Sequence, residues 1–214
     1  MTPNAPVQRR LPAAQRRAML LDAAAELFVA HGVTGTSIDD VATRAGVSKG
    51  AVYHHFASKD DLVGAVEQRF NSAIRDKARA ACGGAGGPDG LQDALAAWTT
   101  AVINAYLDDL ALHDALFYGW APASRQAASD NVLIDDLRQL LLDVGAAEDI
   151  ATVDLAAGFI VAGITTAVDR AVLAGTAEHR GPVIAVAVAC TAGAVAATLP
   201  AHPKPADRKA ENAR

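Results

Sequence analysis

Cysteine and aromatic residues are scarce in this chain, and runs that alternate apolar with polar side chains are missing. The two cysteines, Cys82 and Cys190, lack the paired spacing of a metal site. Two isolated thiols are typical of a reducing cytosol, although a disulfide between them stays open on the sequence alone. Because 51% of the residues are hydrophobic and β-type alternation is absent, the composition predicts an all-α fold.

Signatures of catalysis and of bound cofactors are also lacking. The chain contains no His-Glu-x-x-His, no Gly-x-Ser-x-Gly and no P-loop. It contains four Asp-Asp pairs, but consecutive side chains on a helix point roughly 100° apart and cannot converge on a substrate. The glycine-rich run 82–90 has no preceding strand and no following Lys-Ser or Lys-Thr, so it is interpreted as a linker. We expect no enzymatic activity, no catalytic residue, no cofactor and no metal.

An excess of positive charge is missing too, since the net charge is −5. The distribution nevertheless favours a nucleic-acid partner for the first part of the chain. Residues 1–81 contain 11 Lys and Arg against 8 Asp and Glu, whereas residues 82–214 contain 8 against 16. The chain does not begin with a charged segment followed by an apolar one, so a cytoplasmic location is expected.

The segment Thr36 to Leu62 contains three closely spaced helix starts. Ser37 and Ser48 each stand where a hydroxyl can cap the first N–H groups of a helix, and Gly46 stands where the first helix should stop. A helix of about eight residues, a tight turn and a helix of about seven residues form a helix-turn-helix. The second helix would present a cation, a bare backbone, a phenol and an imidazole (Lys49, Gly50, Tyr53, His54). Such a face suits the major groove of DNA, or it is the polar outside of an ordinary helical hairpin.

This segment and the helix before it resemble the DNA-binding domain of TetR-type transcriptional regulators. The resemblance covers the first quarter of the chain and rests on Ala24 to Phe28, Gly32, Thr36 to Ile38, Ala42, Ala45 to Ser48, Gly50, Tyr53, His55, Phe56, Ser58, Lys59 and Leu62. It implies contacts with phosphates by Thr36, Ser37, Tyr53, His55 and Lys59. It also implies an approach to the bases by Ser48, Lys49, Gly50 and His54, while Arg44 reaches either. His54 occupies a position that varies within the family.

The resemblance and the apolar periodicity together predict five regions. These are a disordered arm (1–12), a three-helix DNA-binding domain (13–58), a connecting helix (59–81), a helical ligand-binding and dimerisation domain (82–199) and a disordered tail (200–214). The connecting helix would have about 23 residues and a length of roughly 34 Å. Two pairs of arginines near the start, Arg9-Arg10 and Arg16-Arg17, either reach DNA or belong to a solvated tail and first helical turn.

The segment Gly181 to Pro203 carries no charge and is long enough to span a bilayer. Its residues are mostly small, and Pro182 suits the first turn of a soluble helix, so a dimer interface is favoured over a membrane span. Small side chains at Ala189, Gly193 and Ala197 would allow a close approach to a second copy. In TetR-type proteins the last two helices form a four-helix bundle across a homodimer, which implies a palindromic double-stranded operator.

Most aromatic residues of the middle of the chain are candidates for an effector pocket: Trp98, Tyr106, His113, Phe117, Tyr118 and Trp120. Large apolar surfaces with polar tips are typical of ligand pockets, although core packing explains them as well. The expected function is a repressor released from its operator by a small apolar or aromatic molecule. The alternative is a helix-turn-helix regulator without a small ligand, controlled by a protein partner or by its abundance.

Overall fold

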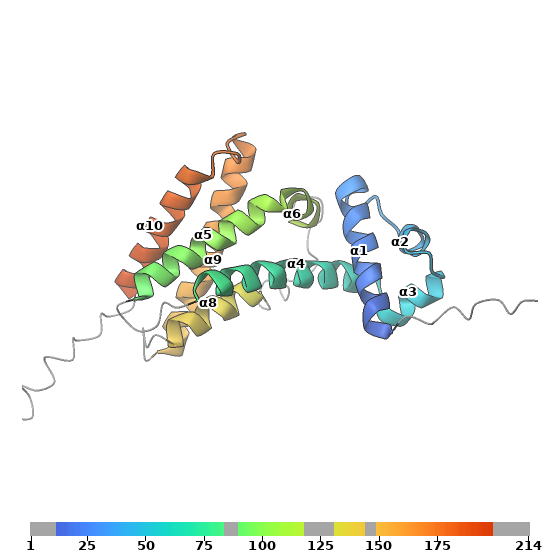
Figure 1. The fold of residues 1–214 in the computed structure, drawn as a ribbon, viewed down its shortest axis with the longest axis horizontal. Coiled ribbons are helices and arrows are strands. Elements are labelled where there is room, and N and C mark those ends of the chain that lie inside the picture. The colour runs from blue at the N-terminus through green and yellow to red at the C-terminus, as the bar shows by residue number, and fades with distance from the viewer. Residues whose placement is uncertain (1–11, 84–89, 118–130, 144–148, 199–214) are drawn as a thin grey trace, which may run out of the picture. The chain divides into compact units, whose positions relative to one another are not determined.

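A computed structural model describes residues 12–83, 90–117, 131–143 and 149–198, and every regular element in these ranges is a helix (Figure 1). The helices are α1 (Ala13–His31), α2 (Ile38–Arg44), α3 (Lys49–His55), α4 (Lys59–Ala81), α5 (Leu91–Asp108), α6 (Leu110–Phe117), α8 (Val132–Asp143), α9 (Ile150–Leu173) and α10 (Arg180–Thr198). The prediction of an all-α fold is confirmed. The predicted arm 1–12 and tail 200–214 lie almost wholly outside the described residues.

The chain divides into two compact units. The first contains Met1–Glu67 and Ala111–Ala123, and the second contains Gln68–Leu110 and Ser124–Arg214. Helix α4 has 23 residues and begins in the first unit and ends in the second, without a break. Its bounds coincide with those of the predicted connecting helix.

Helix caps define the helix-turn-helix in the first unit. The Ser37 hydroxyl accepts from the backbone N–H of Asp40 at 3.2 Å, and the Asp40 carboxylate accepts from the backbone N–H of Ser37 at 2.8 Å. This reciprocal capping box starts α2. Gly46 then takes a φ of +66°, a left-handed conformation that glycine adopts without strain. Ser48 starts α3 by accepting from the backbone N–H of Ala51 at 3.3 Å.

The core of the first unit lies between α1, α2 and α3. Its buried side chains are Leu20, Leu21, Ala24 and Phe28 from α1, Ile38, Val41 and Ala42 from α2, and Val52 with the adjoining Phe56 from α3. The guanidinium of Arg17 lies 5.1 Å from the centre of the Phe56 ring, a cation–π contact between α1 and the end of α3. The buried side of α3 therefore determines which of its side chains remain outside.

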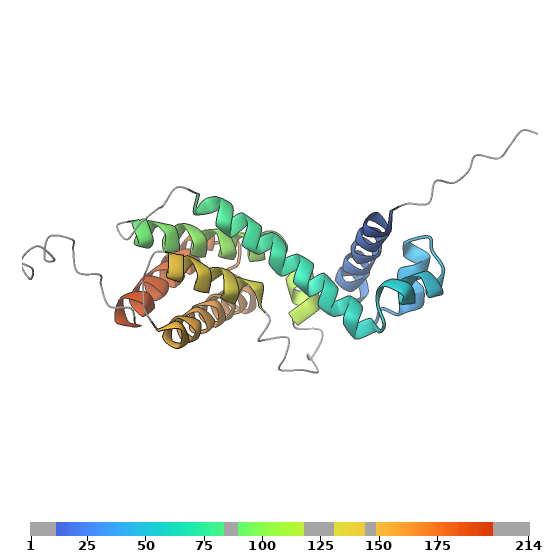
Figure 2. The ribbon, with the colours of Figure 1, turned by 90° about the horizontal axis from the view of Figure 1, so that it is seen from below.

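The second unit is a helical bundle in which α5 packs on α9 and α10, α9 packs on α10, and α8 packs on α9. Figure 2 shows α8 and α9 side by side. Its largest fully buried side chains are Trp98, Leu95 and Ile103 from α5 and Leu133, Leu137 and Leu141 from α8. Thr99 of α5 and Thr191 of α10 share a buried hydrogen bond of 3.4 Å. These helices leave one side of α9 and α10 uncovered, as described below.

Candidate nucleic-acid interface

Helix α3 buries one side and exposes the side that the sequence predicts to meet DNA. Val52 is completely buried, while Lys49, Gly50, Tyr53 and His54 are exposed. The outward position of Tyr53, which is 47% exposed, is unusual for a side chain with so much apolar area. A short helix that turns a phenol, an imidazole and an ammonium toward solvent has the composition of a surface that binds another molecule.

Gly50 has no role in the packing of the first unit. A Cβ built at this position would meet only the Ser48 hydroxyl oxygen, at 4.0 Å. Glycine within a helix costs up to about 1 kcal/mol relative to alanine, so nothing inside the protomer explains its presence. A missing side chain on the exposed face lets another backbone approach α3 closely.

The cations of this face are paired with exposed carboxylates. The Lys49 ammonium lies 2.7 Å from Asp39, whose hydrogen bond and charge raise the pKa of that lysine. The Arg44 side chain binds Glu26, with its Nε at 2.8 Å from the carboxylate. Exposed ion pairs of this kind are weak and screened by salt. Both cations are therefore held in place and still available to phosphates, which would replace the carboxylates as partners.

Three predicted contact residues use their hydroxyl groups inside the fold. Thr36 is only 3% exposed, and its hydroxyl donates to the carbonyl oxygen of Gly32 at 2.9 Å. The Ser37 and Ser48 hydroxyls cap α2 and α3. A phosphate contact through Thr36 would have to break its internal bond, so the structure gives this residue a supporting role in the turn before α2. Its contact with DNA stays a prediction.

The end of α3 lies beside the first turns of α1. Burial, followed by the charges of His54, Arg16 and Arg17, lowers the pKa of His55. Its Nε2 is buried and has no hydrogen-bond partner among the described residues. Arg16 and Arg17 therefore add positive charge next to α3. The sequence left their role open, because it does not show that α1 begins beside the end of α3.

Four of the six predicted pocket residues are described by the structure, and they are divided between the two units. Trp98 and Tyr106 are buried in the second unit, at 0% and 2% exposure. His113 and Phe117 are neighbours on α6 in the first unit, with ring centres 5.1 Å apart. Tyr118 and Trp120 lie outside the described residues. A common pocket for all six stays a prediction.

Comparison with known proteins identifies the exposed helix as part of a known domain. Residues 20–66 match the family model described as bacterial regulatory proteins of the tetR family. The chain is 52% identical over 60 residues to the HTH-type transcriptional activator FasR of Mycolicibacterium smegmatis, covering 28% of this chain and 27% of FasR. It is 41% identical over 64 residues to the repressor KstR2 of Rhodococcus jostii, covering 30% and 31%. The match thus spans less than a third of these two relatives.

Solved structures are similar over most of the chain. A transcriptional regulator from Pseudomonas aeruginosa PAO1 has a TM-score of 0.63 and 27% identity, covering 88% of this chain and 96% of that protein. FadR from Bacillus subtilis, solved in complex with stearoyl-CoA, has a TM-score of 0.63 at 16% identity, covering 84% and 97%, and supports the fold alone.

The first unit thus contains a helix-turn-helix with an exposed α3, and the relatives with which it shares this similarity are HTH-type transcriptional regulators rather than enzymes. Over residues 20–66 the chain is thus similar to bacterial regulatory proteins of the tetR family.

Substitution of Gly50 should change the stability of the first unit and its affinity for DNA in opposite directions. Gly50→Ala should stabilise the first unit by up to about 1 kcal/mol, because helix propensity rises and the Cβ meets open space. If α3 docks on DNA as the sequence predicts, the same methyl group should weaken DNA binding, because it would stand where the DNA backbone approaches. Thermal unfolding and fluorescence anisotropy on an operator fragment measure the two effects. Unchanged affinity in a folded variant would show that α3 does not approach DNA at this residue.

Proposed function

We propose that the protein is a sequence-specific, cytoplasmic DNA-binding regulator, a repressor that leaves a palindromic operator when a small apolar or aromatic effector binds. The observation that carries the DNA-binding part is the exposed face of α3 around Gly50, for which the protomer itself has no use. The relatives include both an activator and a repressor, so the sign of regulation is part of the proposal.

In the proposed complex α3 enters the major groove and the residues around it hold the phosphates. Phosphate contacts fix the position of a protein on DNA and base contacts select the sequence. Lys59, in the first turn of α4, and Tyr53 belong to the first group. Lys49 and His54, which are exposed on α3, belong to the second. Arg44 lies at the end of α2 and serves either group.

The substitutions Lys59→Ala and His54→Ala should impair DNA binding in different ways. Loss of the Lys59 charge should weaken binding about equally on all sequences and reduce the slope of log K against log salt by about one unit. Loss of His54 should change the order of preference among operator variants and leave the salt slope unchanged. Titrations at several salt concentrations on a small operator library distinguish the two results. A Lys59→Ala protein with the original affinity and slope would contradict this docking.

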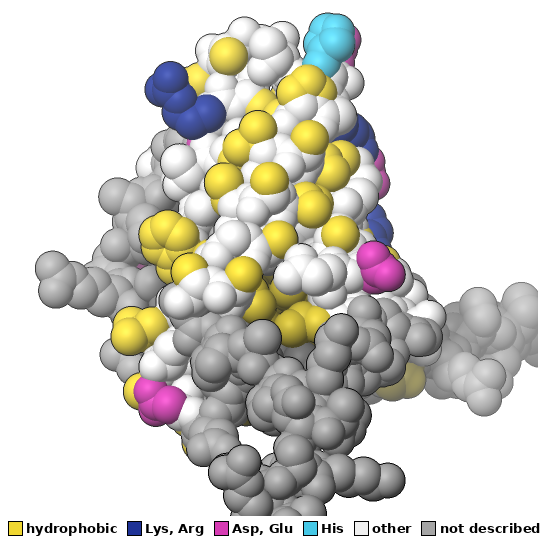
Figure 3. Space-filling model, turned by 90° about the vertical axis from the view of Figure 1, so that its left-hand side faces the viewer, with side chains coloured by type: hydrophobic (Ala, Val, Ile, Leu, Met, Phe, Trp, Pro, Cys, Tyr) yellow, Lys and Arg dark blue, Asp and Glu magenta, His cyan; other side chains and the backbone are white. Residues whose placement is uncertain are grey.

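The proposed dimer would use the uncovered side of α9 and α10. Four large side chains of α9 are mostly exposed in the protomer: Ile150 at 64%, Leu155 at 74%, Phe159 at 72% and Leu173 at 73%. Val186 of α10 is 62% exposed. Figure 3 looks onto the side formed by α10 and shows hydrophobic side chains along its middle and charged ones at its edges. Contiguous apolar surface of this kind marks an interaction site in a soluble protein.

Length and composition alone would also let these two helices cross a membrane. In their most apolar windows, only 33% of the residues of Ile150–Leu173 and 17% of those of Arg180–Ala197 are buried in the protomer. They are therefore not ordinary core helices, and something must cover them. A second copy is the favoured cover, because the exposed side of α10 consists of small residues that permit a close helix crossing. A two-fold dimer also presents two equivalent α3 helices to a palindrome.

Gly193→Arg should produce monomers. Gly193 is exposed on α10 and a Cβ there meets nothing within 4 Å, so the protomer tolerates a longer side chain whereas a close helix crossing does not. Light scattering should give 22.0 kDa for the variant and twice that mass for the original protein. Gln92→Arg, which adds the same charge at an exposed position of α5, is the control and should remain dimeric.

The thiol of Cys190 provides a second measurement of the same interface. Cys190 is free and exposed on α10, in the same side as Gly193. In a Cys82→Ser background this thiol should be protected from alkylation in the dimer and reactive in the Gly193→Arg variant. Equal reactivity in both proteins, together with a dimeric mass in both, would place the dimer interface elsewhere.

Unsatisfied polar atoms in the second unit support an internal effector site. The side-chain oxygens Asn71 Oδ1 on α4 and Asp169 Oδ1 on α9 are buried without a hydrogen-bond partner among the described residues. Tyr106, a predicted pocket residue, is near both elements: its ring lies 5.7 Å from that of Phe70, and burial followed by the charge of Asp169 raises its pKa. Buried acceptors without donors are rare in proteins and indicate a missing water or ligand.

A ligand that releases the protein from DNA must bind more weakly when the operator is present. Coupling free energies of 1–3 kcal/mol correspond to a difference of about 5- to 150-fold in ligand affinity. Calorimetric titration of each candidate effector into the free dimer and into the operator complex measures this difference. Equal affinities would exclude that molecule as the inducer, and a complete absence of ligands with such a difference would favour the alternative regulator that has no small ligand.

A further inference from the structure

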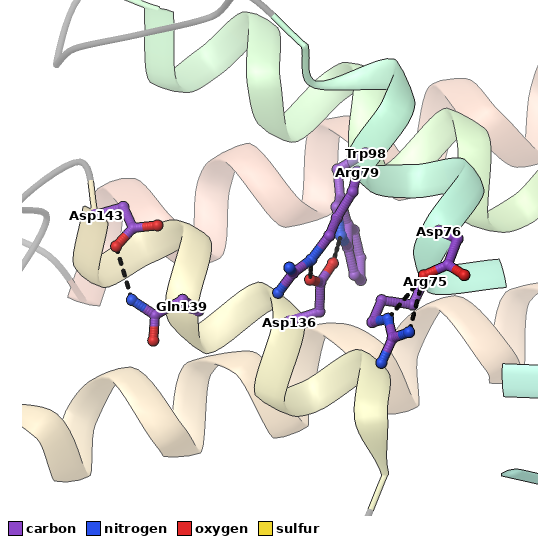
Figure 4. A network of polar contacts seen from close by, with 7 residues as sticks. All are labelled: Arg75, Asp76, Arg79, Trp98, Asp136, Gln139 and Asp143. Atoms are coloured by element: carbon purple, nitrogen blue, oxygen red, sulfur yellow. Dashed lines mark hydrogen bonds and ion pairs between the residues drawn. The ribbon is translucent and has the colours of Figure 1, made fainter. Parts of the chain in front are cut away.

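A buried carboxylate on α8 joins three helices of the second unit. Asp136 is 4% exposed, and each of its oxygens has a different partner. Oδ2 accepts from the indole Nε1 of Trp98 on α5 at 3.0 Å, and Oδ1 forms an ion pair with the Nε of Arg79 on the last turns of α4. Figure 4 shows Arg79 and Trp98 converging on this single carboxylate. The pair is the link between the end of α4 and α8.

The two partners of the ion pair differ sharply in burial. The side chain of Asp136 is 3% exposed, whereas that of Arg79 is 60% exposed. Removal of the cation from a buried carboxylate is strongly destabilising, because the ion pair no longer offsets the cost of desolvating the carboxylate. An exposed guanidinium on a flexible stem moves into water at little cost. The pair is therefore easily broken only if another cation takes the place of Arg79.

A cavity of about 260 Å³ lies beside this pair. It is lined by Arg79, Cys82, Gly83, Trp98, Asp136, Gln139, Leu140 and Asp143. The charged residues of the lining are Arg79, Asp136 and Asp143, so the cavity has one negative charge in excess. This excess favours a cationic ligand over an anionic one. Leu140 and the indole of Trp98 supply apolar surface, and the Gln139 amide donates to Asp143 at 2.7 Å. Burial and the charge of Asp136 raise the pKa of the Cys82 thiol, so Cys82 adds no negative charge to the cavity.

We propose that this cavity binds a small organic monocation with N–H donors, an amidinium, guanidinium or ammonium on a compact apolar body, and that the ligand replaces Arg79 at Asp136. The carboxylate keeps a cationic partner throughout, and Trp98 keeps its hydrogen bond to the other oxygen. Arg79 is released, and with it the link between α4 and α8. An effect of this release on DNA rests on the function proposed above, whereas the binding of the cation does not.

Three molecules that have similar shapes but different charges test whether the cavity prefers a cation. Benzamidine is a cation, benzamide is neutral and benzoate is an anion. Trp98 and Trp120 are the two tryptophans of the chain, so a Trp120→Phe protein reports the cavity through Trp98 fluorescence alone. Benzamidine should change this fluorescence in a saturable manner, and benzamide and benzoate should bind at least about tenfold more weakly because they cannot replace a cation. Equal binding of all three, or tighter binding of benzoate, would overturn the proposal.

Two substitutions should act in opposite directions. Arg79→Ala removes the internal competitor and should tighten benzamidine binding about tenfold or more, since Asp136 would then always be available. Asp136→Asn removes the carboxylate and should abolish cation binding. Arg75→Ala is the control, because Arg75 lies one turn earlier on α4, pairs with Asp76 at 2.8 Å and does not line the cavity. A site in which Arg79 itself holds the ligand would show the reverse result for Arg79→Ala.

If the Arg79→Ala variant is too unstable for titration, thermal unfolding provides a second test of the exchange at Asp136. The buried, unpaired carboxylate should lower Tm by roughly 5–10 °C, and millimolar benzamidine should restore much of that loss whereas benzamide should not. Rescue by both molecules or by neither would contradict the exchange at Asp136. DNA-binding assays with the same proteins are scored separately. Cation binding without any effect on an operator would leave the site in place and remove only its coupling to the proposed function.

Discussion

The burial of Val52 and Phe56 is the contact on which the proposed DNA-binding face of α3 depends. Helices α2 and α3 have seven residues each, and isolated helices of this length are unstable in water. They persist because their first N–H groups are capped by Ser37 and Ser48 and because α2 packs on α1 and α3 packs on α2. Since successive side chains of a helix lie about 100° apart, burying Val52 turns Tyr53 and His54 outward. Lys49 is exposed because it is the first residue of α3. The exposed chemistry of α3 is thus a consequence of its buried side.

Local signals explain why the first unit could be predicted from the sequence. The capping box at Ser37, the cap at Ser48 and the left-handed Gly46 all act over three or four residues, and the structure contains each of them. The start of α4 follows in the same way from Ser58, whose hydroxyl accepts from the backbone N–H of Asp61 at 3.0 Å. Such features depend on neighbours in the chain, and the sequence displays them directly.

Contacts between distant residues could not be predicted. Asp136 lies 57 residues from Arg79 and 38 from Trp98 in the sequence, and an Asp-Asp pair on an amphipathic helix resembles any solvated face. Trp98 was assigned to a ligand pocket for its size and polar tip, and its indole N–H has a buried carboxylate as partner. The burial of Thr36 depends on the carbonyl oxygens of Leu27 and Gly32, which only the fold brings close. The ion pair between Arg44 and Glu26 is likewise tertiary.

Several glycines inside helices have no role in the packing of the protomer. Glycine weakens a helix relative to alanine. Among the described helical glycines, Gly50 on α3, Gly64 on α4, Gly163 on α9, and Gly181 and Gly193 on α10 are exposed, and a Cβ at each would meet no atom closer than 4.0 Å. Gly50 and Gly193 lie on the two surfaces proposed to meet partners. The proposed partner of α3 carries base edges and phosphates. The proposed partner of α9 and α10 is apolar, like the exposed Leu155, Phe159 and Val186. One chain therefore carries two surfaces of opposite chemistry, and α4 is the continuous helix that passes between the units bearing them.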